Sequence, residues 1–112
     1  MKIAVPTAQG SLCMHFGHCE VFTLATVDET TNTISSTEEI VPPPHEPGLL
    51  PQWLREQGVS VVIAGGMGMR AQQLFQQYEI QVVVGAPSES PKEVIGKWLK
   101  GELTTGKNYC DH

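Results

Sequence analysis

The chain has 112 residues, a formal net charge of −5, 40% hydrophobic residues and 17% charged residues, and this balance predicts a single globular domain over 1–112. The acidic charge leaves no basic stripe that could neutralise phosphate groups, so we expect no nucleic-acid partner. No apolar run approaches the ~20 residues of a membrane span, and the apolar N-terminal stretch is too short for a signal peptide, so we expect a cytoplasmic protein with no membrane partner.

Three strands are predicted in the first half of the chain. Residues 2–6 are expected to form a short buried strand that ends at the first proline, and 7–19 a loop. The β-branched and aromatic residues of 20–27 predict a second strand, and the polar stretch 28–33 predicts a hairpin turn. Residues 34–41 predict a more polar strand at a sheet edge, where exposed glutamates discourage aggregation.

Helices and strands alternate in the second half of the chain, after a stiff proline-rich connector at 42–48. Two continuous apolar runs predict strands that are buried on both faces. Ser90 before Pro91 predicts the N-cap of the last helix, and 101–112 predict an irregular tail. The predicted helices are 49–57, 69–78 and 91–100, and the predicted strands are 59–64 and 80–84.

The order of these elements is β-β-β-α-β-α-β-α, which is typical of an α/β protein. The first three strands can form an antiparallel meander, whereas the later βαβ crossovers require parallel pairing with right-handed connections. We therefore predict a mixed five-stranded sheet with helices on both faces.

Four metal-binding side chains lie within seven residues of the predicted loop: Cys13, His15, His18 and Cys19. Thiolate and imidazole are ligands of zinc, copper and iron–sulfur centres. The three cysteines are an odd number, which argues against a complete disulfide framework. The simpler alternative is a loop with buried cysteines and surface histidines. The spacing matches neither a Cys-x2-Cys zinc knuckle nor a ferredoxin run, so it predicts a metal or cluster site without naming the metal.

The last three residues, Cys110-Asp111-His112, repeat this chemistry at the other end of the chain. A frayed terminus is the simpler interpretation. The alternative is an arm whose Cys110 and His112 close over a centre that the first cluster binds. His45 stands alone in the connector, where a solvated side chain is the default. It could instead reach the same site as the loop ligands, because the connector precedes a helix that is expected to start on the side of the sheet where that loop lies.

A glycine-rich stretch separates a predicted buried strand from a predicted helix, with Gly65, Gly66 and Gly68 followed by Arg70. One interpretation is a tight turn that lets the helix pack closely on the sheet. The other is an anion site, because free backbone N–H groups and the positive end of the helix dipole would face a ligand. The stretch matches neither a dinucleotide fingerprint nor a P-loop. An anionic metal cluster would suit it as well as phosphate.

Catalytic constellations are poorly supported by the sequence, so we do not expect an enzyme. The chain has only two aspartates, Asp28 and Asp111, and neither lies on a predicted central strand. A nucleophilic pair of one loop cysteine and one loop histidine keeps an enzyme open, as does small-molecule chemistry at the glycine stretch. A zinc-binding or thiol redox-sensing regulatory module is the main alternative to a cluster site.

Several short motifs occur along the chain in a specific combination. They are Ile3-Ala4-Val5-Pro6, His15-Phe16-Gly17-His18 followed by Phe22, His45 before Pro47-Gly48-Leu49-Leu50-Pro51, Gly65-Gly66-Met67-Gly68 with Arg70-Ala71, Gly101-Glu102-Leu103, and the Cys110-Asp111-His112 tail. Together they resemble the dinitrogenase iron–molybdenum cofactor biosynthesis family, as a small stand-alone member, over nearly the whole chain.

The resemblance implies a ribonuclease H-like fold, but without nuclease activity, because the first strand lacks the carboxylates that would hold divalent metals. It implies that the protein binds, carries or stores a metal–sulfur cluster, either iron–sulfur or molybdenum-containing, in metallocofactor assembly. A protein that donates or receives the cluster is the implied partner. The expected ligands are Cys13, His15, His18, Cys19, His45, Cys110 and His112, and Gly65, Gly66, Gly68 and Arg70 are expected to receive the anionic face of the cluster.

Overall fold

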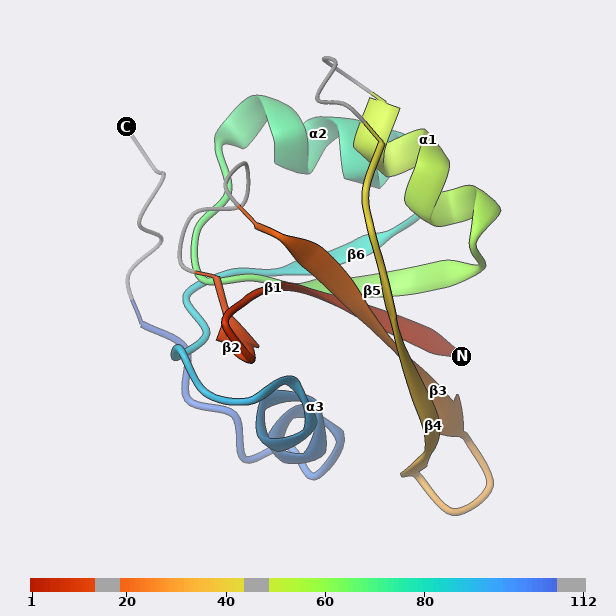
Figure 1. Ribbon diagram of the computed structural model, residues 1–112, viewed down its shortest axis with the longest axis vertical. Helices are drawn as coiled ribbons and strands as arrows, with labels where there is room; N and C mark the ends of the chain where they lie inside the picture. The colour runs from red at the N-terminus through yellow and green to blue at the C-terminus, as the bar shows by residue number, and fades with distance from the viewer. Residues whose placement is uncertain (14–18, 44–48, 107–112) are drawn as a thin grey trace.

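The computed structural model of the protein describes residues 1–13, 19–43 and 49–106. It consists of one twisted sheet with helices on both faces (Figure 1). Across these three ranges, no helix is long and apolar enough to cross a membrane. The elements in chain order are β1 Lys2–Ala8, β2 Ser11–Leu12, β3 Val21–Asp28, β4 Thr33–Ile40, α1 Leu49–Glu56, β5 Val59–Ile63, α2 Met69–Gln77, β6 Gln81–Val83 and α3 Pro91–Leu99.

The sheet has the strand order β4-β3-β1-β5-β6, with the short β2 paired to the end of β1. β3 pairs antiparallel with both β1 and β4, and β5 pairs parallel with both β1 and β6. Of the five strands in this order, β3 runs in one direction and the other four run in the opposite direction. The antiparallel meander, the parallel crossovers, the mixed sheet and the ribonuclease H-like fold are therefore confirmed.

The strand count was predicted one too low, because residues 7–19 are not entirely a loop. β1 continues past Pro6 to Ala8, and a two-residue turn returns the chain into β2, with Thr7 opposite Leu12. Gln9 and Gly10 have φ angles of 55° and 80°, and two positive φ values are the mark of a tight hairpin turn. Pro6 lies past the part of β1 that pairs with β5, which ends at Ala4, so β5 does not need the missing N–H and the strand can continue.

β6 was predicted to be buried on both faces, and this is wrong. It is a three-residue strand at the edge of the sheet, with Gln81 exposed and Val82 and Val83 only partly buried. Apolar composition alone does not show which parallel strand will lack an outer neighbour. β5 lies inside the sheet and has the burial that was expected, with four of its five residues buried.

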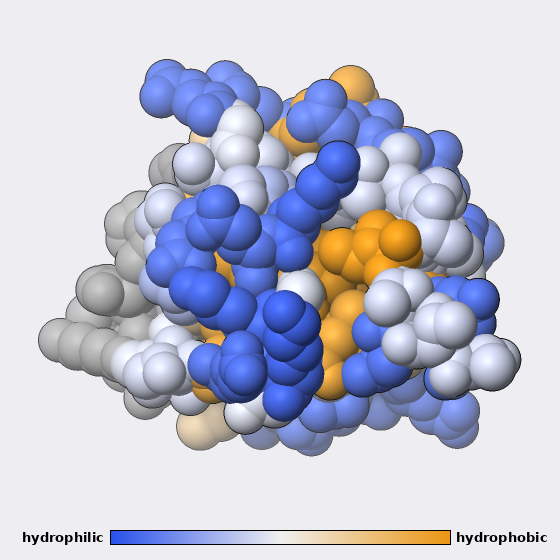
Figure 2. All heavy atoms as spheres, turned by 90° about the horizontal axis from the view of Figure 1, so that it is seen from below, coloured by the Kyte–Doolittle hydropathy of each residue, from blue (hydrophilic) through white to orange (hydrophobic). Residues whose placement is uncertain are grey.

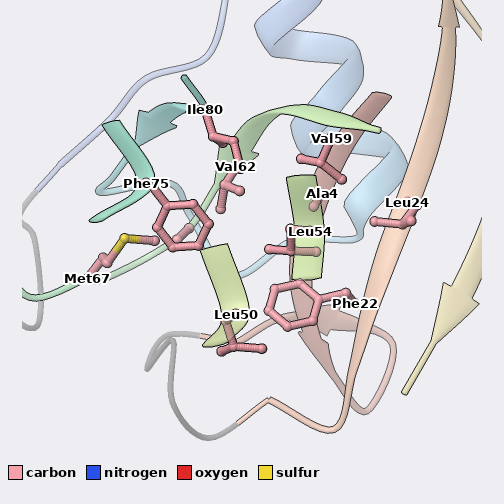
Figure 3. Close-up of a cluster of buried hydrophobic side chains, with 11 residues drawn as sticks. Ala4, Phe22, Leu24, Leu50, Leu54, Val59, Val62, Met67, Phe75 and Ile80 are labelled. Atoms are coloured by element: carbon pink, nitrogen blue, oxygen red, sulfur yellow. The ribbon is translucent and has the colours of Figure 1, made fainter. Parts of the chain in front are cut away.

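One core lies between the sheet and the helices α1 and α2 (Figure 3). Leu50 and Leu54 point from α1 onto the strands, and Phe75 comes from α2. The ring of Trp53 packs edge-on to Phe22 with centroids 6.0 Å apart, a geometry that aromatic pairs favour. The buried members of this core are Ala4, Phe22, Leu24, Leu50, Leu54, Val59, Val62, Ala64, Met67, Phe75 and Ile80.

A second core lies on the opposite face, under α3, where Val94 and Ile95 meet residues of β1, β3 and β5. The predicted N-cap of α3 is confirmed, because the Ser90 hydroxyl accepts the Glu93 N–H at 3.3 Å. Seen from the α3 side, hydrophilic side chains surround an apolar strip (Figure 2). α3 therefore covers only part of this face of the sheet.

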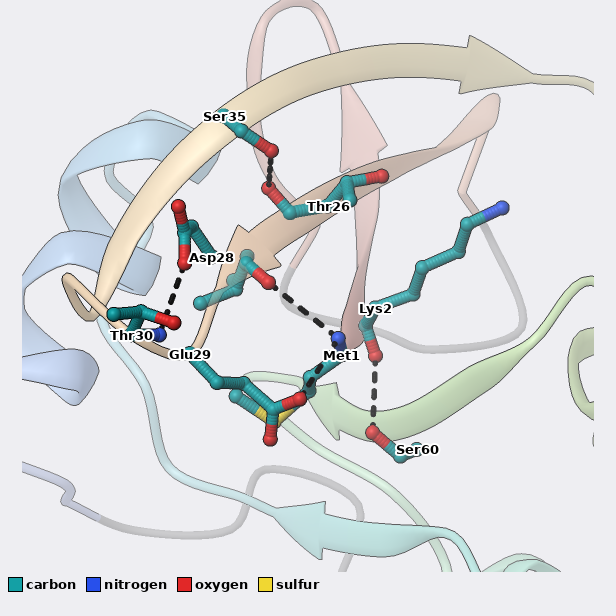
Figure 4. Close-up of polar contacts among 9 residues, drawn as sticks. Met1, Lys2, Thr26, Asp28, Glu29, Thr30, Ser35 and Ser60 are labelled. Carbon is teal, nitrogen blue, oxygen red and sulfur yellow. Dashed lines mark hydrogen bonds and ion pairs between the residues drawn. The ribbon is translucent and has the colours of Figure 1, made fainter.

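Polar contacts fix the end of the sheet where β1 begins (Figure 4). The Met1 ammonium donates to the Val27 carbonyl at 3.4 Å and lies 3.6 Å from the Glu29 carboxylate. The Asp28 carboxylate accepts the Thr30 N–H at 2.9 Å and so orders the β3–β4 turn. The opposite end of the sheet, where β1, β5 and β6 finish, carries the sequence motifs.

Candidate functional site

The loop with the four predicted ligands leaves and returns at the carboxyl end of β1. The Cys13 N–H donates to the Pro6 carbonyl at 2.8 Å, and the Glu20 N–H donates to the Thr7 carbonyl at 2.9 Å. Both ends of the loop are therefore bonded to consecutive residues of one strand. The carboxyl ends of strands in open α/β sheets are where such proteins form binding crevices.

Leu12, the residue before Cys13, is held from two sides. Its N–H donates to the Glu89 carbonyl at 2.8 Å, and its carbonyl accepts the Ser88 hydroxyl at 2.8 Å. At the other end of the loop, the Glu20 carboxylate accepts the Gln9 N–H at 2.9 Å. Ser88 and Glu20 could not be predicted from sequence, because both act through contacts with distant or turn residues.

The proline-rich connector begins and ends at the same edge of the sheet. β4 finishes at Ile40, which lies opposite Phe22, and Phe22 in turn lies opposite Pro6 near the end of β1. α1 precedes β5 in a crossover and runs back toward the start of β5, so its first turn faces the end where β5 finishes (Figure 1). The flanks of His45 are thus brought to the carboxyl edge, although His45 itself is outside the described residues.

The C-terminal segment also returns to this edge through a series of three glycines. The Gly85 N–H donates to the Gly65 carbonyl at 2.9 Å, and the Gly106 N–H donates to the Gly85 carbonyl at 2.7 Å. Gly65 follows β5 and Gly85 follows β6, so both belong to the carboxyl edge. No motif surrounds Gly85 or Gly106 in the sequence, so neither was predicted to belong to the site.

Cys13 and Cys19 are half-buried thiols rather than a disulfide. Cys19 packs against the core under α1 and α2. Burial, and secondly the charge of Cys13, raise the pKa of Cys19 to about 11. A thiolate at Cys19 is therefore disfavoured, the more so when Cys13 carries negative charge.

The glycine stretch leads into α2 without a side-chain cap. Gly68 is the N-cap residue, with φ −65° and ψ 155°, and it makes no side-chain cap hydrogen bond. A Cβ built at Gly68 would meet nothing within 4 Å among the residues that the structure places. The positive end of the α2 dipole beside this space would suit an anionic ligand.

The residues around Gly68 show how this loop is held. Gly65 and Gly66 are buried, and Gln72 donates from its amide to the Met67 carbonyl at 2.9 Å. Met67 is fully buried in the core, whereas Met69 and Arg70 are exposed in the first turn of α2. Arg70 therefore lies in the exposed first turn of α2, directly after the buried part of the loop.

Five of the seven predicted metal ligands lie outside the described residues: His15, His18, His45, Cys110 and His112. Within 1–13, 19–43 and 49–106, no three His, Cys, Asp or Glu side chains form a group that could hold a metal ion. The described part of the site thus consists of two sulfur donors and an uncapped helix N-terminus. Soft thiolates suit copper, zinc and iron–sulfur centres, and the helix end suits negative charge.

Comparison with known proteins gives a family model that matches residues 1–101 and is described as dinitrogenase iron-molybdenum cofactor. A curated relative, the uncharacterised protein MJ0580 of Methanocaldococcus jannaschii, is 29% identical over 109 residues, which cover 92% of this chain and 89% of that protein. The match to the family model spans every described helix and strand.

Two solved structures are similar over almost their whole lengths. The crystal structure of PH0822 has a TM-score of 0.85 and 26% identity, and the alignment covers 94% of each chain. The apo form of the orange protein from Desulfovibrio gigas has a TM-score of 0.71 and 20% identity, with 96% of this chain and 93% of that chain covered. At 20% identity, the similarity to the orange protein shows a shared fold only.

Proposed function

The chain belongs to the dinitrogenase iron-molybdenum cofactor family, and from this premise we propose that it binds and carries a metal–sulfur cluster at the carboxyl edge of its sheet. One observation carries the proposal. Four segments that bear thiol, imidazole or glycine motifs, far apart in sequence, all begin or end at this edge. Formation of the hydrophobic core alone does not require these four segments to begin or end at one edge of the sheet.

The thiols would supply the metal-binding side of the site. At neutral pH the raised pKa keeps Cys19 protonated in the metal-free protein. A bound metal would displace this proton, since the thiolate is the form that ligates. The cationic metal would also relieve the repulsion between Cys13 and Cys19. The pair is therefore suited to hold positive charge and poorly suited to exist as two thiolates without it.

The N-terminus of α2 would receive the sulfide-rich, anionic side of the cluster. Backbone N–H groups of the first turn have no intrahelical partner, and Gly68 leaves space beside them. Arg70 adds a positive charge at the same helix end. One site would thus offer sulfur donors to the metals and N–H donors to the sulfides.

We propose a carrier rather than a catalyst. The thiols of the site lie only half-buried at the end of the sheet, and the helix N-terminus beside Gly68 is open. An exposed site allows a cluster to be received from one protein and handed to another, so a donor or acceptor protein is the proposed partner. The thiol ligands would have to remain reduced, which suits the cytoplasm.

A thiol redox sensor is the main competing function, and the site does not favour it. Sensor cysteines have a lowered pKa, because the thiolate is the reactive form. The pKa of Cys19 is instead raised, by burial and by Cys13. A plain zinc site would use the same ligands but would be colourless and would contain no sulfide, so the experiment below separates it from a cluster.

Anaerobic reconstitution with ferrous iron and sulfide tests the proposal. Wild-type protein should develop visible charge-transfer bands that saturate at a fixed ratio of iron to chain. The Cys13→Ser and Cys19→Ser variants should each lose most of this absorbance while keeping the wild-type circular dichroism spectrum. A parallel reconstitution with thiomolybdate and copper would test the molybdenum-containing class of cluster.

Two outcomes would overturn the proposal. Absence of bands in wild-type protein under both reconstitutions would exclude cluster binding. Bands of wild-type strength in both serine variants would exclude Cys13 and Cys19 as ligands. Stoichiometric uptake of zinc without sulfide would instead support the zinc module. Binding of inorganic phosphate that survives removal of every cysteine would support small-molecule chemistry at the glycine stretch.

A further inference from the structure

β4 forms one free edge of the sheet (Figure 1). It is eight residues long, and no strand among the described residues pairs with its outer side. An edge strand presents backbone N–H and C=O groups to solvent, and bulges or charged side chains usually protect it. β4 has a shift of register against β3 and the exposed charges of Glu38 and Glu39. Protection of the edge does not, however, require the cavities that lie beside it.

Two neighbouring cavities lie along β4, on the face of the sheet that α3 covers in part. One, of about 450 Å³, is lined by residues of β1, β3 and β4 and by the start of α3. The other, of about 210 Å³, is lined by residues 34–37 of β4 and by Lys92. Thr37 and Lys92 line both cavities, so the two follow each other along the strand. A strand added to β4 would direct every second side chain towards this face.

The floor of the larger cavity has hydroxyl groups whose direction is fixed. The Thr7 hydroxyl donates to the Val5 carbonyl at 2.9 Å, and the hydroxyl oxygens of Thr7 and Thr23 lie 2.8 Å apart. Because a hydroxyl has one proton, both bonds form only when Thr23 donates to Thr7. The buried Thr23 oxygen therefore offers the cavity lone pairs alone, so it can only accept a hydrogen bond from a ligand.

Glu39 adds a carboxylate next to this acceptor. It lies opposite Thr23 in the register of β3 and β4, which places the two Cβ atoms about 5 Å apart, and both residues line the cavity. Glu39 is exposed and forms no ion pair within the described ranges. An acceptor oxygen beside a carboxylate matches a cationic N–H donor, such as an ammonium or a guanidinium group. Among the described lining residues, Lys92 on the α3 side is the only cation that opposes it.

We propose that the β4 edge and the larger cavity dock an extended, basic segment of a partner protein. The segment would add a strand to β4, and one of its lysine or arginine side chains would enter the cavity at Thr23 and Glu39. Main-chain hydrogen bonds would then give affinity, and the cavity would give specificity.

A second copy of this chain fits the cavity poorly. The free β4 edge of that copy would be equally acidic, and the other edge strand, Gln81–Val83, has no charged residue. Like charges that face each other across two strands are destabilising. The proposal also does not depend on the proposed function, because the larger cavity lies on the α3 face, whereas Cys19 packs against the core on the other face.

Titration of isotope-labelled, full-length protein with a synthetic peptide, followed by NMR, tests the docking site. The probe is a capped peptide of alternating threonine and arginine, as long as β4. We expect saturable shifts of amide signals in β4 and in the first turn of α3. A peptide with glutamate in place of arginine should cause none. Arginine amide should bind at least about tenfold more weakly than the probe, since it cannot form the main-chain hydrogen bonds.

Charge variants separate the cavity from general attraction. Glu39→Gln should weaken binding of the arginine peptide about fivefold, the upper range for an exposed ion pair. Lys92→Gln should strengthen binding about twofold, because it removes the opposing charge. Glu56→Gln is the matched control, since Glu56 is exposed on α1 and its change alters the net charge by the same amount. This control should bind as wild type does.

A pair of Thr23 variants tests the acceptor oxygen. Thr23→Val removes the hydroxyl with little change of shape and should weaken the arginine peptide about fivefold, whereas Thr23→Ser keeps the hydroxyl and should bind as wild type does. Thermal unfolding of both variants checks that the fold is kept. Equal affinity of these two variants would overturn the role of the Thr23 oxygen.

Three results would overturn the docking site as a whole. They are no saturable shift with the arginine peptide, equal weakening by Glu39→Gln and Glu56→Gln, and shifts spread over the surface instead of confined to β4 and α3. Equal affinity of arginine amide and the peptide would overturn strand addition and leave a small-molecule cavity. No step of this experiment uses metal or sulfide, so its failure is distinct from failure of the proposed function.

Discussion

Cys19 is the residue at which burial bears most directly on the proposed metal chemistry. It packs against the core under α1 and α2, and burial is the main cause of its raised pKa, followed by Cys13. The sequence could place two cysteines in one loop, but it could not show that one of them packs against the hydrophobic core. This explains why the spacing pointed to a metal without indicating the charge that the site prefers.

The thiol chemistry of Cys19 should therefore change with pH and with Cys13. Burial disfavours the thiolate, so alkylation of Cys19 by iodoacetamide should be slow at pH 7 and should rise through pH 10 towards the pKa of about 11. Cys13→Ser removes the group whose negative charge contributes to this pKa and should lower it, so the modification should become faster at pH 10. Peptide mass spectrometry measures Cys19 separately from Cys110. Modification at pH 7 as fast as that of a small free thiol would contradict this explanation.

Gly68 allows stability to be separated from cluster binding. Gly68→Ser supplies an N-cap hydroxyl for α2 and should raise the free energy of unfolding by a few tenths of a kcal/mol. The same side chain occupies the space beside the helix end, so it should weaken cluster uptake several-fold. Gly96→Ala in α3 is the control, because it should also stabilise the protein, by about 0.5–1 kcal/mol, and leave uptake unchanged. Denaturant unfolding and visible titration measure the two effects, and full uptake by the serine variant would exclude this part of the site.

At the level of elements, α1 links the core to the connector that carries His45. Leu54 is fully buried under this helix, while Gln52, two residues earlier, is exposed. Leu54→Ala should lower the free energy of unfolding by about 3 kcal/mol, since it leaves a cavity between α1 and the sheet. Gln52→Ala should change it by less than about 0.5 kcal/mol. Urea unfolding of both variants measures this, and a loss below about 1 kcal/mol for Leu54→Ala would mean that α1 packs differently.

The helices and long strands could be predicted from sequence because apolar periodicity and turn residues act locally. The N-cap Ser90 is an example, since its partner, Glu93, lies only three residues away. β2 could not be predicted, because its turn is Gln9-Gly10 rather than the usual Asn-Gly or Asp-Gly. The edge position of β6 was missed for another reason: which strand lies outside is decided by the order of the whole sheet.

At the scale of the whole molecule, the site is a property of the topology. Leu12 is bonded to Ser88 and Glu89, Gly65 to Gly85, and Gly85 to Gly106. Each bond joins segments that are at least 20 positions apart in sequence, and single-sequence patterns do not report such pairs. The resemblance predicted that the motifs belong together, and the fold supplies the common edge at which their segments begin and end.

The proposed role, a carrier that operates through proteins rather than nucleic acids, also agrees with the charge of the chain. The formal net charge of −5 would repel a phosphate backbone, while the positive end of α2 gives a local exception at the site. The cluster would lie at one end of the sheet, and the N-terminus and the β3–β4 turn are fixed at the other end (Figure 4). A partner protein could therefore approach the site without contacting the elements that stabilise the opposite end.

The content of metal and acid-labile sulfide in protein purified and reconstituted without oxygen tests the central claim most directly. We expect iron or molybdenum and sulfide both to be present at more than one atom per chain. We also expect both to fall to background in the Cys13→Ser/Cys19→Ser double variant, whose fold should be unchanged. Metal without sulfide in wild-type protein, or equal metal and sulfide in the double variant, would contradict it.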